Sequence, residues 1–235
     1  MDLKRLAAAF RQRLPRQLFR LVGATGAAVL TPVSFSLRTG HFRSALRSRA
    51  VDAAGAPLPW YTYPAIDFLA HQDVTGRRVL EWGAGHSTLW WAGRAVSIVA
   101  FESDPEWFAW IRRAAPQAAI HHVPDDLTGV DEHLGGARFD LIIVDGLDRY
   151  RCAVRSVGLL ADGGAILLDD SEGYWGRDGE YPILDLMRAQ GFQRVDFYGF
   201  APGVYWPHCT SLFFRDRCFL LTGARPPERL WGASR

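Results

Sequence analysis

Glycine, acid and hydroxyl residues gather at one point of this 235-residue chain, in the segment EWGAGHST at 81–88. The segment follows the apolar run 79–82 and leads into the helix-like stretch 87–94. Gly83 and Gly85 allow the backbone to turn tightly and to approach a ligand closely. The N–H groups at the start of a helix favour an electron-rich partner. The pattern therefore predicts a small-molecule cofactor site between a strand and a helix.

A second acid, Glu102, ends the next apolar run at 97–102. A carboxylate at this place suits paired hydrogen bonds to the hydroxyls of a ribose. The dinucleotide-binding form of such a turn is G-x-G-x-x-G, and here Thr88 stands at the third glycine position. Glu81, ahead of the first glycine, suits a ligand with ammonium and sulfonium charges and would repel a pyrophosphate. A NAD-dependent oxidoreductase is therefore the least favoured enzyme class.

Apolar runs and helix-like stretches alternate along most of the chain, and this pattern must position the turn. The strand-like runs are 79–82, 97–102, 119–123, 139–145 and 165–169, and the helix-like stretches between them are 87–94, 105–115 and 149–160. Such alternation predicts a parallel sheet covered by helices on both faces. The last two strand-like runs, 194–198 and 211–221, have no helix between them, which predicts an antiparallel pair at one sheet edge.

Over residues 60–221 these features resemble those of the class I S-adenosylmethionine-dependent methyltransferases. The features are the acid-x-G-x-G turn, the acid that ends the second strand, FDLIIVDG at 139–146, the glycine turn at 163–164 that leads into AILLDD, and the closing hairpin. The resemblance implies an α/β fold with a Rossmann-like, doubly wound sheet of seven strands, mostly parallel with an antiparallel C-terminal edge strand. It implies S-adenosylmethionine over the carboxyl ends of the first, second and fourth strands.

The resemblance also implies a role for each residue of the predicted cofactor site. Glu81, Gly83 and Gly85 approach the methionine part, with Ser87 and Thr88 close by at the start of the helix. Glu102 takes the ribose hydroxyls, and either Asp125 or Asp126 lies near the adenine. The predicted cofactor-binding set is Glu81, Gly83, Gly85, Ser87, Thr88, Glu102, Asp125, Asp126 and Asp145. For each acid the competing interpretation is a helix cap or a solvated loop residue.

The ends of the fourth and fifth strands resemble those of the catechol O-methyltransferase branch, where an Asp and an Asp-Asn pair hold a divalent cation. Asp145 and Asp170 match the two aspartates, but Ser171 stands in place of the asparagine, and a hydroxyl is a poorer magnesium ligand. The loop 146–150 also lacks the lysine that serves that branch as general base. We therefore predict no metal ligands, with a divalent cation as the less favoured alternative. Asp145 and Asp170 are the predicted catalytic residues, because a positioned carboxylate can accept a proton.

Aromatic and histidine residues surround the expected acceptor side. The segments 60–64, 174–175 and 205–206 carry tryptophans and tyrosines, whose faces and hydroxyl tips suit sugars, phenols or lipid head groups. His86 either faces the acceptor or is a solvated loop residue. His208 is predicted to lie in a pocket wall and to be a poor metal ligand. The expected acceptor is therefore a small-molecule, glycan or lipid-linked hydroxyl.

Charge divides the chain into two expected domains, a basic helical arm at 1–50 and a cofactor-binding domain at 51–235. The arm holds ten of the 27 Lys and Arg residues but only one acid, Asp2. Residues 1–22 have the pattern of a basic amphipathic helix that Pro15 kinks or splits, and such a helix either lies on an anionic membrane or packs on the body. The uncharged stretch 21–37 is short and weak for a membrane-spanning helix.

The remaining composition narrows the expected partners and location. The domain at 51–235 has no basic stripe or zinc-finger pattern, so no nucleic-acid partner is expected. The three cysteines form no CxxC motif, which favours reduced thiols and a cytoplasmic protein, peripheral to the membrane if the arm binds lipid. The leading hypothesis is a methyltransferase. An aminopropyltransferase-like enzyme and a non-catalytic cofactor-binding or membrane-surface module are the alternatives.

Overall fold

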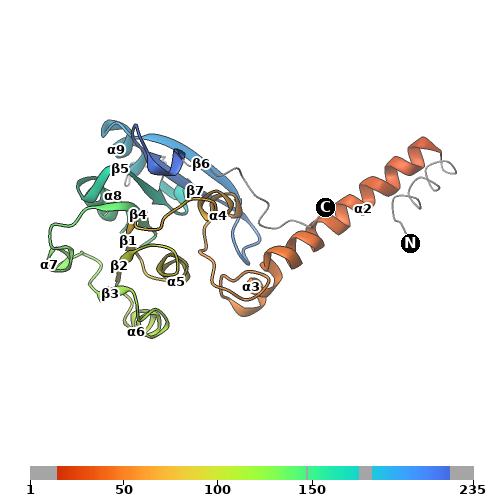
Figure 1. Ribbon diagram of the computed structural model, residues 1–235. Coiled ribbons are helices and arrows are strands. Elements are labelled where there is room, and N and C mark those ends of the chain that lie inside the picture. Colours follow the sequence, from red (N-terminus) through yellow and green to blue (C-terminus); the bar gives the residue numbers. More distant parts are fainter. Residues whose placement is uncertain (1–14, 147, 175–181, 223–235) are drawn as a thin grey trace.

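The computed structural model describes residues 15–146, 148–174 and 182–222, which form an α/β body with one long helix projecting from it (Figure 1). Its seven-stranded sheet has the order β3-β2-β1-β4-β5-β7-β6. The strands are β1 Arg78–Trp82, β2 Ser97–Glu102, β3 Ala119–His122, β4 Phe139–Val144, β5 Leu160–Leu168, β6 Gln193–Phe200 and β7 Pro207–Phe214. β3, β2, β1, β4 and β5 are parallel, and β7 is antiparallel to both β5 and β6. The predicted doubly wound sheet with an antiparallel C-terminal strand is confirmed.

Helices cover both faces of the sheet because successive strand residues point to opposite sides. Val79, Leu141 and Ile143 face one core cluster, and Leu80 and Ile142 face another. Helices on the first side are α4 Tyr63–Ala70, α5 His86–Ala92 and α6 Pro105–Ala114, and those on the second are α7 Val130–Leu134, α8 Arg149–Leu159 and α9 Ile183–Ala189. The nearly continuous apolar strands are thus buried from both sides.

The turns after β1 and β4 touch each other at the carboxyl edge of the sheet. Gly83 has a φ of +94°, and a Cβ at this position would lie 2.8 Å from the backbone nitrogen of Gly146. A side chain is therefore excluded by contact with Gly146 as well as by the left-handed backbone. The close packing of these two turns therefore requires glycine at position 83, whether or not a ligand is bound.

The C-terminal strand is shorter than the predicted run 211–221. β7 ends at Phe214, and a turn containing Arg217 at a φ of +66° leads to the short 3-10 helix η2 Phe219–Leu221. The apolar residues after the turn, such as Leu220, are buried in the core. The predicted C-terminal strand is therefore too long at its end, because the apolar residues after the turn are buried without belonging to the strand.

The projecting helix is α2 Arg16–Thr39, and the short helix α3 His41–Arg47 follows it (Figure 1). α2 begins directly after Pro15, whereas the rest of the predicted amphipathic segment, residues 1–14, lies outside the described residues. By length and composition α2 can cross a membrane. α2 extends beyond the uncharged stretch 21–37 at both ends, so the helix is longer than the stretch that the sequence predicted to be short for a membrane-spanning segment.

Candidate active site

A cavity of about 350 Å³ lies at the carboxyl ends of β1, β2 and β4. Most of the predicted cofactor-binding residues line it, namely Gly83, Gly85, Ser87, Glu102, Asp125 and Asp145. These residues end or follow four strands, β1 to β4, and the parallel sheet brings them to one edge. The cavity is therefore the place where the predicted constellation assembles.

Glu81 and Thr88 lie behind the cavity wall and not in it. Both side chains are fully buried. The Thr88 hydroxyl donates a hydrogen bond to Glu81 Oε2 and accepts one from the backbone N–H of Gly85 at 2.8 Å. Burial raises the pKa of Glu81 to about 8. In this structure the pair braces the glycine turn from below, a placement that residue types alone did not indicate.

Glu102 lines the cavity at the end of β2. Its Oε1 accepts hydrogen bonds from the backbone N–H groups of Ser103 at 2.9 Å and Asp104 at 2.8 Å. Burial raises its pKa, and these backbone hydrogen bonds lower it. The carboxylate is thus held rigidly at the cavity wall, where a sugar hydroxyl can reach it.

The structure separates the two acids that follow β3. Asp125 lines the cavity, whereas Asp126 is exposed and its Oδ1 accepts the backbone N–H of Thr128 at 2.9 Å. This hydrogen bond is typical of a turn-capping aspartate. Of the pair, Asp125 is the candidate for the cofactor site.

His86 is buried in an aromatic cluster, so its interpretation as a solvated loop residue is wrong. Its ring centroid lies 5.2 Å from that of Trp60 and 5.1 Å from that of Trp110. Burial, together with the nearby charge of Arg49, lowers the pKa of His86 to about 4. Its Nδ1 is buried and has no hydrogen-bond partner among the described residues. A neutral imidazole with one unsatisfied nitrogen therefore lines the cavity.

Arg149, which the sequence analysis did not single out, joins the two predicted catalytic aspartates. Its Nη2 lies 2.8 Å from Asp145 Oδ1 and 3.2 Å from Asp170 Oδ2. Burial raises the pKa of Asp145 to about 6, although the Arg149 charge opposes this shift. Asp170 lies just outside the cavity lining and adopts a φ of +51°. The guanidinium thus supplies positive charge where two strand ends bring carboxylates together.

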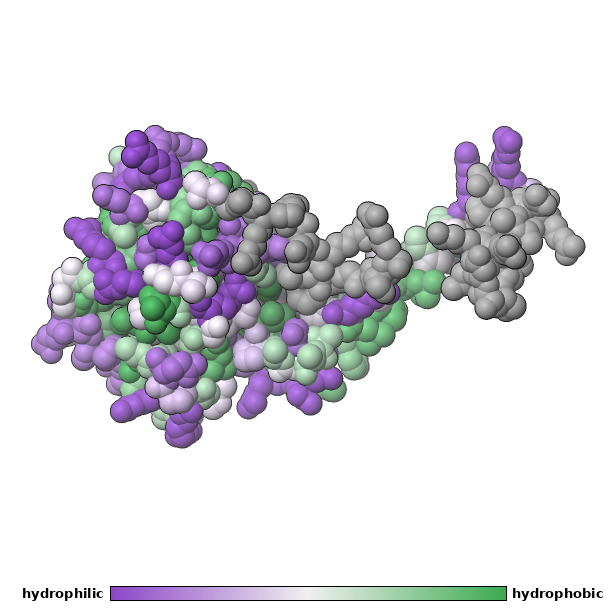
Figure 2. Space-filling model, in the orientation of Figure 1, coloured by the Kyte–Doolittle hydropathy of each residue, from purple (hydrophilic) through white to green (hydrophobic). Residues whose placement is uncertain are grey.

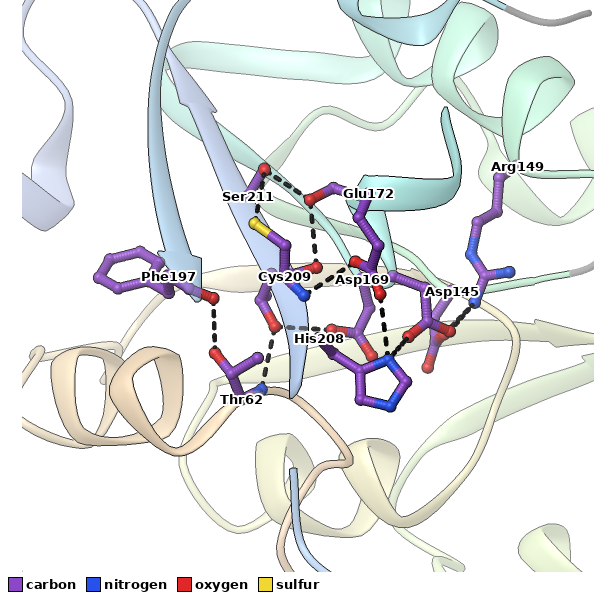
Figure 3. Close-up of polar contacts among 12 residues, drawn as sticks. Thr62, Asp145, Arg149, Asp169, Glu172, Phe197, His208, Cys209 and Ser211 are labelled. Atoms are coloured by element: carbon purple, nitrogen blue, oxygen red, sulfur yellow. Dashed lines mark hydrogen bonds and ion pairs between the residues drawn. The ribbon is translucent and has the colours of Figure 1, made fainter. Parts of the chain in front are cut away.

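His208 approaches the same group from β7 (Figure 3). Its Nδ1 lies 3.0 Å from Asp170 Oδ1 and 3.1 Å from Glu172 Oε1, and Glu172 Oε2 accepts the backbone N–H of Cys209 at 2.8 Å. His208 was predicted to lie in a pocket wall, and Glu172 was not among the predicted site residues. His208 meets Asp170 and Glu172 because β7 pairs with β5. The predicted closing hairpin did not say which strand β7 would pair with.

Among the described residues, two groups of side chains have ligand atoms close enough to hold a metal ion. In each group the atoms lie within 4.8 Å of one another: Asp145, Asp169 and Asp170 in one, and Asp170, Glu172 and His208 in the other. Asp169 is buried and accepts a hydrogen bond from Thr210 Oγ1 at 2.7 Å, and burial raises its pKa well above the usual range. The carboxylates are suitable ligands for a hard cation, but Arg149 already neutralises part of their charge.

Ser171, the residue in place of the expected asparagine, faces away from these groups. Its hydroxyl donates to the carbonyl oxygen of Cys209 at 3.1 Å and accepts from Ser211 Oγ at 2.7 Å. The residue therefore helps to fasten the end of β5 to β7. Asp169 directly follows β5. The pair of residues that joins Asp145 in the cluster is therefore Asp169 and Asp170, and not Asp170 and Ser171.

Comparison with known proteins supports the fold and leaves the family undecided. No family model and no curated protein matches the chain. Among solved structures, cofactor-bound Rv0187 from MTB is 20% identical with a TM-score of 0.55, covering 79% of this chain and 95% of that one. A putative O-methyltransferase from Klebsiella pneumoniae is 18% identical with a TM-score of 0.52, covering 82% and 94%.

A third solved structure, a TehB-like SAM-dependent methyltransferase from Corynebacterium glutamicum, is 14% identical with a TM-score of 0.50, covering 76% of this chain and 98% of that one. The three likenesses extend over most of each chain, although few residues are identical. The chain therefore has the Rossmann-like fold of SAM-dependent methyltransferases.

Proposed function

We propose that the chain is an S-adenosylmethionine-dependent methyltransferase that transfers a methyl group to a hydroxyl. The observation that carries this proposal is the cavity at the carboxyl ends of β1, β2 and β4, where the glycine turn, Glu102 and Asp125 converge. Ligands of open α/β sheets bind at this edge of the strands. The solved structures with the same fold include SAM-dependent methyltransferases, which makes this cofactor the first choice.

The residues of the cavity fit the parts of that cofactor. Gly85 lets the backbone come close to the methionine part, and the Glu102 carboxylate accepts hydrogen bonds from the ribose hydroxyls. Asp125, which follows β3 and lines the cavity, would lie near the adenine. The unsatisfied Nδ1 of His86 offers one hydrogen bond to a polar atom of cofactor or acceptor. When bound, the cofactor supplies an electrophilic methyl group.

The group around Asp170 is placed to remove the proton from the acceptor hydroxyl. Transfer forms an oxygen–carbon bond and breaks the sulfur–carbon bond, and the hydroxyl proton passes to a carboxylate. Asp170 contacts both Arg149 and His208. The His208 Nδ1 atom, 3.0 Å from Asp170 Oδ1, can share a proton that Asp170 accepts. General-base assistance of this kind contributes about a hundredfold or more to rate.

A divalent cation is the second candidate for the charge at this site. The close ligand atoms of Asp145, Asp169 and Asp170 favour it. Arg149 and a cation compete for the same carboxylates, since its Nη2 already lies within hydrogen-bond reach of two of them. We therefore assign the positive charge at the reaction centre to Arg149 and treat a cation as a replaceable alternative.

The exposed aromatics of the turn before β7 suggest the acceptor class. The Trp206 ring lies 5.8 Å from the His208 imidazole, and the Tyr205 ring lies 4.2 Å from that of Trp206. Aromatic faces at the rim of a site suit sugars, phenols or lipid-linked groups. Trp175, another residue of the predicted acceptor wall, lies outside the described residues.

The direct test is transfer of a labelled methyl group from S-adenosylmethionine to panels of phenolic, glycan and lipid-linked hydroxyls. We expect label in at least one acceptor that carries a free hydroxyl and none in the matched O-methylated compound. Cofactor binding without turnover on any panel would favour a non-catalytic module. Transfer of an aminopropyl group from the decarboxylated cofactor would instead favour the aminopropyltransferase alternative.

A further inference from the structure

Helix α2 exposes a large apolar surface for which the described part of the chain provides no cover. Figure 2 shows hydrophobic residues along this helix where it leaves the body. The large apolar side chains that are at least 43% exposed on it are Leu18, Leu21, Val22, Val29, Leu30, Val33 and Leu37. Continuous apolar surface of this size marks a site of interaction, because its exposure to water is unfavourable.

Arginines lie on the opposite side of the same helix. Arg38 follows Arg20 by five turns of about 3.6 residues, so the two side chains share one side, and Arg16 lies one turn before Arg20. Val29 and Val33 lie on the other side. This division into an apolar side and a basic side is the pattern of a helix that lies in the interface of a membrane.

Length argues for the same orientation. The uncharged stretch 21–37 rises about 25 Å, whereas the hydrocarbon core of a bilayer is about 30 Å thick. Gly, Ser, Thr and Pro32 also occupy many of its positions. Although α2 passes the length and composition test for a spanning helix, its one-sided arginines fit a position along the membrane surface better.

The base of α2 adds exposed aromatic and apolar residues. The turn 201–206 packs on α3, where the backbone N–H of Gly203 donates to His41 Nδ1 at 3.2 Å and the rings of Phe200 and His41 are 6.4 Å apart. The exposed large residues of α3, of this turn and of the end of β6 before it are Phe42, Leu46, Phe200, Tyr205 and Trp206. Tryptophan and tyrosine are enriched where a protein meets the lipid head groups.

We propose that α2, α3 and the turn 201–206 form a lipid-binding surface that docks on an anionic bilayer. The apolar side of α2 enters the acyl boundary, and its arginines face the head groups and water. Arg43, Arg47 and Arg49 add positive charge at the base, where each basic residue near an anionic surface strengthens attachment. The basic composition of residues 1–50, with ten Lys and Arg residues and one acid, complements the negative charge of an anionic bilayer.

The lipid-binding surface is joined to the cavity by Trp60. Its indole N–H donates to the carbonyl oxygen of Pro202 in the turn at 3.1 Å, and its ring packs against His86 in the cavity wall. Arg49, just beyond α3, lies over the Trp110 ring of the same aromatic cluster. If the proposed function holds, docking therefore brings the methyl-transfer site beside the bilayer, and the acceptor is a hydroxyl of a lipid or lipid-linked molecule.

The test is flotation of the full chain with vesicles made of equal parts phosphatidylcholine and phosphatidylglycerol, and with vesicles of phosphatidylcholine alone. We expect strong flotation with the anionic vesicles and weaker flotation with the neutral ones. The double variant Val29→Asp/Val33→Asp should lose about tenfold or more in binding, because each charge replaces a side chain that enters lipid. Both positions are exposed, so the fold of the body should be unaffected.

The matched control is Ala24→Asp/Thr31→Asp, which adds the same charges on the arginine side of α2 and should retain most of the binding. Equal loss in both variants, or no flotation of the parent with anionic vesicles, would overturn the proposal. A dimer that protects α2 from proteolysis without lipid would assign the apolar side to a second copy. Titration of S-adenosylhomocysteine into the same variants keeps this result separate from the proposed function, since neither variant touches the cavity.

Discussion

The Nη2 atom of Arg149 lies 2.8 Å from Oδ1 of Asp145, one helical turn before it in the chain. α8 begins at Arg149, so the guanidinium is carried back over the end of β4 to the carboxylate. The same nitrogen also reaches Asp170 at the end of β5. A fixed positive charge is thereby built into the carboxyl edge of the sheet, where the proposed function requires an acceptor hydroxyl to lose its proton.

The first prediction concerns this charge. Arg149→Gln should lower kcat by about a hundredfold, because a preorganised electrostatic contact at a reaction centre is worth about a hundred- to a thousandfold. The affinity for S-adenosylhomocysteine should change little, and added magnesium should restore part of the rate. The matched control is Arg151→Gln, which removes an ion pair between an exposed arginine of the same helix and its N-cap residue Asp148. Equal rates in the parent and Arg149→Gln would remove Arg149 from the mechanism.

The second prediction separates the base from a metal. Asp170→Asn should slow turnover by about a hundredfold, the usual scale for a general base, and a chelator should leave the parent active. Asp126→Asn, an isosteric change in an exposed turn, serves as the control and should have the parent's rate. Chelator-sensitive turnover that magnesium restores would show that a cation, and not Arg149, supplies the charge.

The third prediction concerns the ribose. Glu102→Ala should weaken cofactor binding by about 1.5–3 kcal/mol, because it removes charge-assisted hydrogen bonds. Glu102→Gln keeps an acceptor at the same place and should cost less. Calorimetric titration of both variants checks this. Parent-like affinity in both would reduce Glu102 to its role as a cap for Ser103 and Asp104.

The fourth prediction concerns Glu81 and pH. The pKa of this buried acid is raised from 4.5 to about 8, so between these values the folded chain keeps a proton that the unfolded chain has lost. The contribution of Glu81 to the free energy of unfolding should therefore be fully present below pH 4.5. It should fall as pH rises towards 8, by at most about 1.4 kcal/mol per pH unit. Glu81→Gln should flatten this dependence in denaturant titrations. A variant with the parent's pH dependence would assign the raised pKa to another group.

The alternation of strands and helices could be predicted from the sequence because it depends on local patterns. Val79–Trp82 and the glycines after it carry their own signal, as does the Asp104 cap, whose Oδ1 accepts the backbone N–H of Trp107 at 2.6 Å. The position of Glu102 at the cavity followed from the same logic, since parallel strands end at one edge.

The partners of the two aspartates that are predicted to be catalytic could not be predicted in the same way. Arg149 and His208 come from α8 and β7 and meet at Asp170, so the contact depends on how three elements pack. Depth of burial was also hidden, so the sequence could not predict that Glu81 lies fully buried behind the cavity wall. The sequence did not predict one helix over 16–39, because the uncharged stretch covers only 21–37 and was considered apart from the residues on either side.

The most direct test of the central claim is calorimetric titration of S-adenosylhomocysteine into the parent and into Gly85→Val. A Cβ at Gly85 meets its nearest atom, Trp107 Nε1, at 3.8 Å, so the variant should fold, whereas a Cβ at Gly83 would collide with Gly146. We predict micromolar binding to the parent, about −7 to −9 kcal/mol, and at least a tenfold loss in folded Gly85→Val. Parent-like affinity in the variant, or binding of NAD in place of S-adenosylhomocysteine, would contradict the account.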